Sequence, residues 1–149
     1  MTARWLAASL HLLALGIGLG AVWARGRALR SALDPRSLRQ VFLADSLWGL
    51  AFVLWIGTGL WRLLAGLEKG TGYYLQNHVF LTKMALLALV LLLELKPMIT
   101  LIRWRAAVAR GQTPDTRVAG LLARISFVQA GLIVLMVFAA TAMARGVGM

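Results

Sequence analysis

The sequence predicts an all-α integral membrane protein, a four-helix bundle with both termini on the outer side of the membrane. Of the 149 residues, 60% are hydrophobic and only 14% are charged, which excludes an ordinary water-soluble domain. Four apolar stretches are each long enough to cross roughly 30 Å of hydrocarbon as a helix. Only short connections remain between them, so we expect a single four-span domain over residues 1–149.

The four expected spans differ in the polar residues that they carry. The first, residues 5–23, is apolar or small except for one serine and His11. The third carries Lys83 and Glu94, and also Pro97, which should kink the helix or end its regular part. The second, third and fourth spans are expected at residues 43–64, 79–102 and 125–144.

The connections 24–42 and 103–124 are rich in arginine, with five arginines in each. Both lie on the same side of the membrane, and by the positive-inside rule that side is cytoplasmic. We therefore expect a multi-pass protein of the bacterial inner membrane. The net charge of +11 then reflects topology and contact with anionic lipid headgroups, so the partner is the lipid bilayer and not a nucleic acid. The Asp34-Pro35 step signals a turn or a helix start.

Two other features narrow the class of protein. The alternative reading of the first stretch is a cleaved secretory signal, but its apolar run is longer than a typical signal core and an arginine block follows it as a stop-transfer sequence. The chain has no cysteine, which excludes disulfides, thiolate metal sites and cysteine nucleophiles.

His11 and Lys83 are expected at the same depth in the membrane. Both spans enter from the outer side, and each residue lies about six positions in, or roughly 9 Å at the rise of an α-helix. Lys83 shares a helical stripe with Glu94, which should face the bundle interior because ionisable groups are costly in lipid. His11 shares a face with Gly18 and other small residues, which permit close approach of a helix or of a flat cofactor.

Each of these residues also has a simpler interpretation. His11 would hydrogen-bond a backbone carbonyl or Thr58 of a neighbouring helix, and Lys83 would extend outward to the interface. The Gly16-x-x-x-Gly20 pattern is typical of helix packing. Glu94 has three candidate partners, namely Lys96, a loop arginine, or Gln129 on the fourth span.

Four segments of the chain resemble a family of small bacterial membrane proteins of unknown function. These segments are LHLLALGIGLG, DSLWGLAFVLWIGTGLWR, NHVFLTKMALLALVLLLELKPMITLIRWR and FVQAGLIVLMVFAATAMARG. More distantly, the chain is similar to HemJ-type protoporphyrinogen oxidases, through His11, Lys83 and the step Ala109-Arg110-Gly111. It also resembles the CopD membrane domain. The oxidases' tyrosine-histidine pair in the third span is replaced by leucines and Glu94, and their Asn-Glu-Val-Pro-like stretch by residues 127–130.

The HemJ resemblance implies a haem b site with His11 and Lys83 as axial ligands of the iron. Arg62 and Arg145, at the outer ends of the second and fourth spans, would then pair with the haem propionates, and Gly18 would allow close approach of the ring. Such a site would serve electron transfer or porphyrin oxidation, which are oxidoreductase chemistry. The sequence assigns no catalytic residue and does not decide whether the chain is an enzyme.

Two other functions stay open. One is a non-catalytic four-helix subunit or assembly factor without a cofactor, which would form a homodimer or join a larger membrane complex. The other is a pathway for a small solute or ion that uses Lys83, Glu94 and Asp45.

Overall fold

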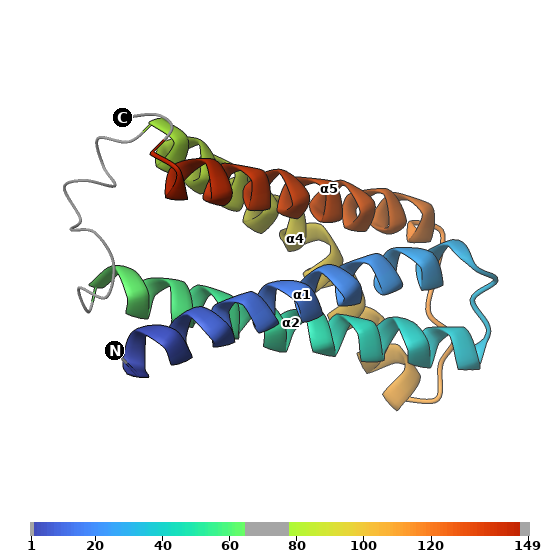
Figure 1. The fold of residues 1–149 in the computed structure, drawn as a ribbon. Coiled ribbons are helices and arrows are strands. Elements are labelled where there is room, and N and C mark those ends of the chain that lie inside the picture. The colour runs from blue at the N-terminus through green and yellow to red at the C-terminus, as the bar shows by residue number, and fades with distance from the viewer. Residues whose placement is uncertain (1, 65–77, 147–149) are drawn as a thin grey trace.

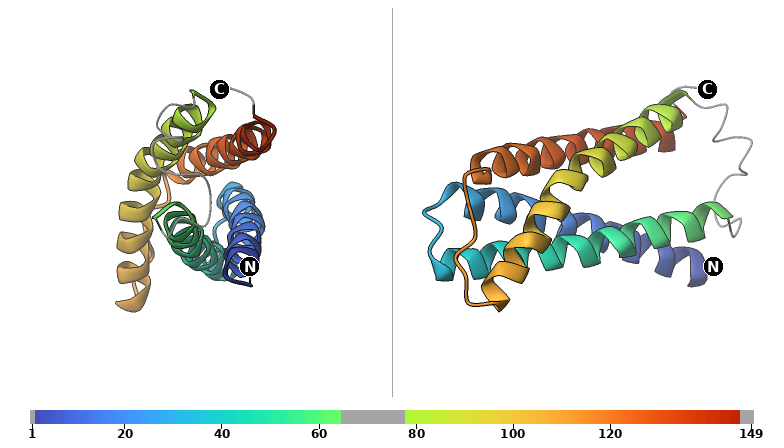
Figure 2. Two further views of the ribbon diagram at one scale, coloured as in Figure 1. Left: turned by 60° about the vertical axis from the view of Figure 1, so that its left-hand side comes forward. Right: turned by 180° about the vertical axis from the view of Figure 1, so that it is seen from behind.

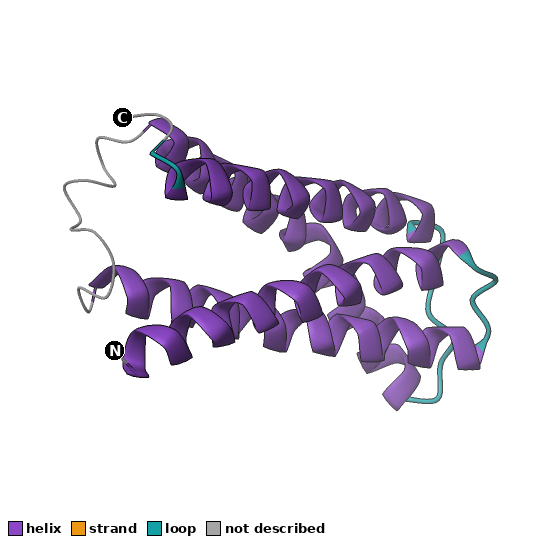
Figure 3. Cartoon of the chain, viewed as in Figure 1, coloured by secondary structure: helices purple, strands orange, loops and turns teal. Residues whose placement is uncertain are grey.

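The described residues of the computed structural model form four long helices, which confirms the all-α class. The structure describes residues 2–64 and 78–146, and the loop expected between the second and third spans lies outside them. All four helices are long and apolar enough to cross a membrane. They are α1 (Thr2–Arg30), α2 (Pro35–Leu64), α4 (His78–Ala109) and α5 (Ala119–Ala144), as Figures 1 and 3 show.

The helices are arranged as two pairs that converge at one end. α1 packs along α2, α5 packs along α4, and α1 and α5 join the two pairs. The pairs come together at the end that holds the connections 31–34 and 110–118, called the loop end from here on. They spread apart toward the end where α1 begins and α5 finishes, called the terminal end (Figures 1 and 2).

Each helix contains its expected span and continues past it at the loop end by about two turns. The arginine-rich stretches were expected as connections, but Arg25, Arg27 and Arg30 are helical and belong to α1. Arginine, alanine and leucine are good helix formers, so nothing in this stretch ends the helix once it has left the apolar segment. The connection between α1 and α2 is therefore only residues 31–34.

The expected helix start at Asp34-Pro35 is confirmed. Pro35 is the first residue of α2, where its missing N–H costs no hydrogen bond. The backbone N–H of Ser37 donates to Oδ1 of Asp34 at 2.8 Å, as in an N-cap. This hydrogen bond holds the pKa of the Asp34 carboxyl below its usual value. The cap therefore contributes at neutral pH and is lost as the pH falls through that lowered pKa.

Pro97 does not end its helix, because α4 runs through it to Ala109. The ring is buried, and the helix changes direction along its length in Figure 2. Proline removes one backbone hydrogen bond and disturbs the preceding turn, so it is the physical cause of a bend in this helix. The bend directs the last turns of α4 across α2 at the loop end.

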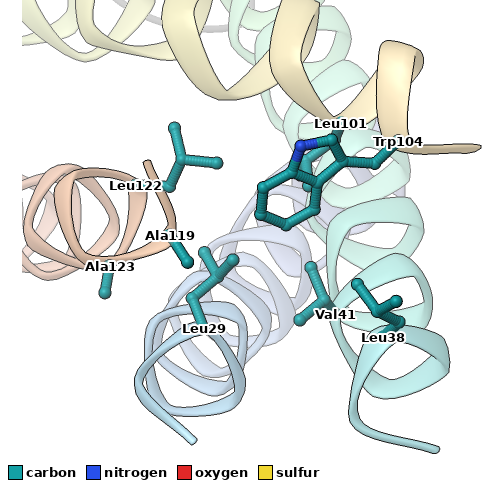
Figure 4. Close-up of a cluster of buried hydrophobic side chains, with 8 residues drawn as sticks. All are labelled: Leu29, Leu38, Val41, Leu101, Trp104, Ala119, Leu122 and Ala123. Carbon is teal, nitrogen blue, oxygen red and sulfur yellow. The ribbon is translucent and has the colours of Figure 1, made fainter. Parts of the chain in front are cut away.

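The hydrophobic core is densest at the loop end and thins toward the terminal end. At the terminal end the buried cluster consists of Ala14, Trp55 and Met136, and Ala7 is buried separately on α1. The loop-end cluster draws on all four helices and surrounds the indole of Trp104 (Figure 4). Its members are Leu29, Leu38, Val41, Leu101, Trp104, Ala119, Leu122 and Ala123.

Arg25 lies one helical turn before Leu29 on α1, on the side of this cluster toward the terminal end, and is completely buried. Its Nη1 donates to Asp45 of α2 and to Glu94 of α4, both at 2.9 Å. Its Nη2 donates to the other oxygen of Glu94 at 3.0 Å and to Gln129 of α5 at 2.8 Å. Its Nε donates to Ser126 of α5 at 3.0 Å. All five N–H groups of the guanidinium therefore have an acceptor, and one side chain of α1 binds the other three helices.

The carboxylates around Arg25 have further partners. Nε2 of Gln129 donates to Glu94 and to the carbonyl of Val90. Arg105, at the end of α4, donates to the second oxygen of Asp45 at 3.1 Å and to the carbonyl of Phe42. The arginine cluster, defined here as Arg25, Asp45, Glu94, Gln129, Ser126 and Arg105, thus has two positive and two negative charges.

We expect Arg25→Met to destabilise the protein by about 3–5 kcal/mol, because it leaves the carboxylates of Asp45 and Glu94 without their buried counter-charge. Unfolding in detergent, followed by circular dichroism, measures this change. Arg27→Met is the matched control, since Arg27 is exposed and lies half a turn further along α1.

The double variant Arg25→Met, Glu94→Gln tests the electrostatic reason for this loss. It should recover part of the lost stability, because it removes the unpaired charge as well as the arginine. Equal unfolding curves for Arg25→Met and Arg27→Met would contradict the role assigned to Arg25.

Candidate functional site: a cavity at the terminal end

The terminal end contains a cavity of about 160 Å³ that is open on one side. All four helices contribute to it: His11 from α1, Lys83 from α4, Met136 from α5, and Trp55 and Arg62 from α2. The remaining wall is almost entirely apolar and includes Ile56, Leu60, Leu63, Phe80, Met84 and Leu87. The structure thus brings His11 and Lys83 to one cavity, as their common depth in the sequence suggested.

His11 is held in place through one ring nitrogen. Nδ1 lies 3.0 Å from the carbonyl oxygen of Trp55 and 3.0 Å from Oγ1 of Thr58. A carbonyl oxygen can only accept, and the Thr58 hydroxyl already donates to the carbonyl of Leu54 at 2.8 Å. The proton is therefore on Nδ1, and a neutral ring carries its lone pair on Nε2.

Two further contacts fix the plane of the His11 ring. The ring stacks on the indole of Trp55, with centroids 5.8 Å apart and planes inclined by 29°. On its edge lies Gly59, where a Cβ atom would come within 3.2 Å of His11 Cε1. The simpler interpretation of His11, a hydrogen bond to a carbonyl or to Thr58, is thus what the structure shows. The same bonds orient the imidazole as the outer partners of metal-bound histidines do.

The other candidate site residues lie in different places. Arg62 lines the cavity, one turn beyond Thr58. Gly18 instead packs at the α1–α2 interface, where a Cβ would meet Trp48 at 3.4 Å and Ala51 at 3.5 Å. Arg145 is the C-cap of α5, with its backbone N–H bonded to carbonyls of the last turn, and it is not among the residues that line the cavity.

Asp45 and Glu94 belong to the arginine cluster at the other end. Arg25 follows His11 by 14 positions on α1, so about 21 Å of helix separates the cluster from the cavity. Lys83, Glu94 and Asp45 therefore do not line one common cavity. Of the three partners considered for Glu94, the structure shows a loop-end arginine, Arg25, together with Gln129.

A family comparison covers almost the whole chain. The family described as "Predicted membrane protein (DUF2214)" matches residues 3–148. The chain belongs to this family. No curated protein and no solved structure matches it. The comparison supports a small membrane protein and does not show the HemJ or CopD resemblance.

Within this DUF2214 protein, sequence reasoning missed Trp55 and Gly59 as parts of the site. Trp55 is buried, and its indole N–H has no acceptor in the described part of the chain. Such a buried unpaired donor costs about 1–3 kcal/mol. The available signal was the spacing of Trp55, Thr58 and Gly59, which share one face of α2 at intervals of three and four residues. Residues 2–64 and 78–146 contain no group of three or more His, Cys, Asp or Glu side chains that could hold a metal ion.

We expect Gly59→Ala to displace the imidazole of His11, because the added Cβ approaches Cε1 more closely than ordinary packing allows. The ¹⁵N chemical shifts of the His11 ring, recorded in detergent, measure this change. Gly57→Ala is the matched control, since a Cβ there has no neighbour within 4 Å. If both variants left the ¹⁵N chemical shifts of the His11 ring unchanged, the conclusion that His11 packs against Gly59 would be contradicted.

Proposed function

We propose that this chain is a haem b-binding protein of the bacterial inner membrane, with His11 and Lys83 as axial ligands of the iron. The observation that carries the proposal is that both side chains line one cavity, from α1 and α4, while Nδ1 of His11 is already bonded. That bond leaves Nε2, the nitrogen with the lone pair, for a ligand. On the positive-inside rule, the loop end faces the cytoplasm and the cavity lies in the outer half of the bilayer.

The donor groups fit haem better than the size of the cavity does. Imidazole and amine nitrogens are suitable iron ligands, and the apolar walls would exclude water. A cavity of about 150 Å³ holds a molecule such as benzene, and a porphyrin is much larger. The cavity of about 160 Å³ is therefore sufficient only if part of the ring lies outside it or the helix pairs move apart.

The chain's own residues would perform three tasks at this site. The Trp55 carbonyl and the Thr58 hydroxyl hold His11 with Nε2 available. Arg62, which lines the same cavity, would bind a propionate carboxylate of the haem. Haem b would supply electron transfer or porphyrin oxidation, with its potential set by the axial ligands and by burial. Gly18 and Arg145 were expected at the haem site from the sequence, but they do not line this cavity and have no part in the proposed site.

One observation favours the second candidate function, a non-catalytic subunit that packs against another membrane protein or a second copy. Gly16 and Gly20 are exposed on α1, and a Cβ at either position would have no neighbour within 4 Å. Small residues at this spacing let a second transmembrane helix approach closely. This candidate requires a larger native particle that Gly16→Leu reduces in size.

We expect the protein, purified in mild detergent from cells supplied with haem, to show a Soret band and sharp α and β bands after reduction by dithionite. His11→Ala and Lys83→Ala should each alter the spectrum, because each removes one axial ligand. His78→Ala and Lys96→Ala are matched controls, since both residues are exposed and neither lines the cavity.

A colourless protein would refute haem binding. A haem spectrum that His78→Ala changes as much as His11→Ala would show that the ligand is elsewhere.

A further inference from the structure

The exposure of the lining residues shows on which side the cavity opens. Leu60 of α2 and Met84 of α4 line the cavity and are 50% and 41% exposed. Trp55 and Met136 line it too but are only 6% and 1% exposed. The mouth is therefore flanked by α2 and α4, and its back wall is formed by Trp55 and Met136.

The arrangement of the helices agrees with a mouth between α2 and α4. Extensive packing joins α1 to α2, α4 to α5 and α1 to α5, and α2 and α4 are not among these pairs. The two pairs separate toward the terminal end, as the views in Figures 1 and 2 both show. Two side-chain links between α2 and α4, through Arg25 and Arg105 of the arginine cluster, lie toward the loop end.

The mouth lies within the part of the helices that crosses the bilayer. Leu60 is four residues from the end of α2, and Met84 is six residues from the start of α4. At the rise of an α-helix these positions are about 6 Å and 9 Å from the helix ends. Both residues are apolar and lie inside the expected spans, so we expect lipid hydrocarbon in front of the mouth.

We propose that the cavity is filled from the lipid, through a lateral mouth between Leu60 and Met84, and that its ligand is an amphiphile dissolved in that leaflet. The ligand's apolar body passes between α2 and α4, and a polar group reaches the side of the cavity lined by His11 and Arg62. This inference rests on the proposed site and adds how it is filled. Its test uses no haem, so the two proposals can fail separately.

The test uses tryptophan fluorescence in vesicles of phosphatidylcholine with brominated acyl chains, which quench an indole only at short range. If the mouth admits lipid chains, Trp55 is quenched although it is buried. Trp48 is the matched reference, because it is equally buried on α2 but does not line the cavity. We expect Trp55→Phe to lower the quenched share of the emission and Trp48→Phe to raise it. Trp104→Phe repeats the reference with a buried tryptophan at the loop end.

Narrowing the mouth tests the route itself. Leu60→Phe and Met84→Phe should each reduce the quenching of Trp55, whereas Val134→Phe, on an exposed part of α5 outside the cavity, should not. Equal protection of Trp55 and Trp48 from brominated chains would overturn the proposal. So would quenching of Trp55 by aqueous iodide alone, since that would mean that the cavity opens to water. The comparison of Trp55→Phe with Trp48→Phe decides the matter even if a mouth variant fails to fold.

Discussion

The interaction on which this structure depends is the buried guanidinium of Arg25. Removing a charge from water is costly, and the cost is offset only when the partners are complete and well oriented. Here all five N–H groups have acceptors, which come from α2, α4 and α5. The guanidinium is planar and its N–H groups donate in fixed directions. It therefore also fixes how the four helices are aligned. A slide of one helix by a turn, about 5.4 Å, would separate these partners.

The position of the arginine cluster explains why the two ends of the bundle differ. Lipid tails are as apolar as leucine, so hydrophobic contact alone does little to hold helices together in a membrane. Toward the loop end, polar bonds and the Trp104 cluster join all four helices. At the terminal end the shared buried core consists of small contacts around Ala14, Trp55 and Met136. The bundle is therefore tightly packed at the loop end and loosely packed at the terminal end. The cavity with His11 and Lys83 is at the terminal end.

Helical periodicity predicted more of the candidate site than the interpretation of single residues did. Lys83 and Glu94 were expected on one inward face of α4, and both are partly buried, with the fully buried Val90 between them on the same face. The hydrogen bond from His11 to Thr58 was the simpler interpretation of His11, and the structure shows it. Gly18, in contrast, was grouped with a cofactor because glycine permits close approach. Whether a helix or a cofactor makes that approach is not encoded in the residue, and here Trp48 of α2 makes it.

The sequence by itself determined the class, the number of spans and the start of α2, because span length, charge bias and the Asp34-Pro35 step act locally along the chain. Only the tertiary structure decided that Arg25 is a core residue and not one more topology signal. Its neighbours Arg27 and Arg30 have the same chemistry and are exposed. The difference is the helical phase of Arg25, which directs it at carboxylates 20 and 69 residues further along the chain. Such partners become visible only once the helices have packed.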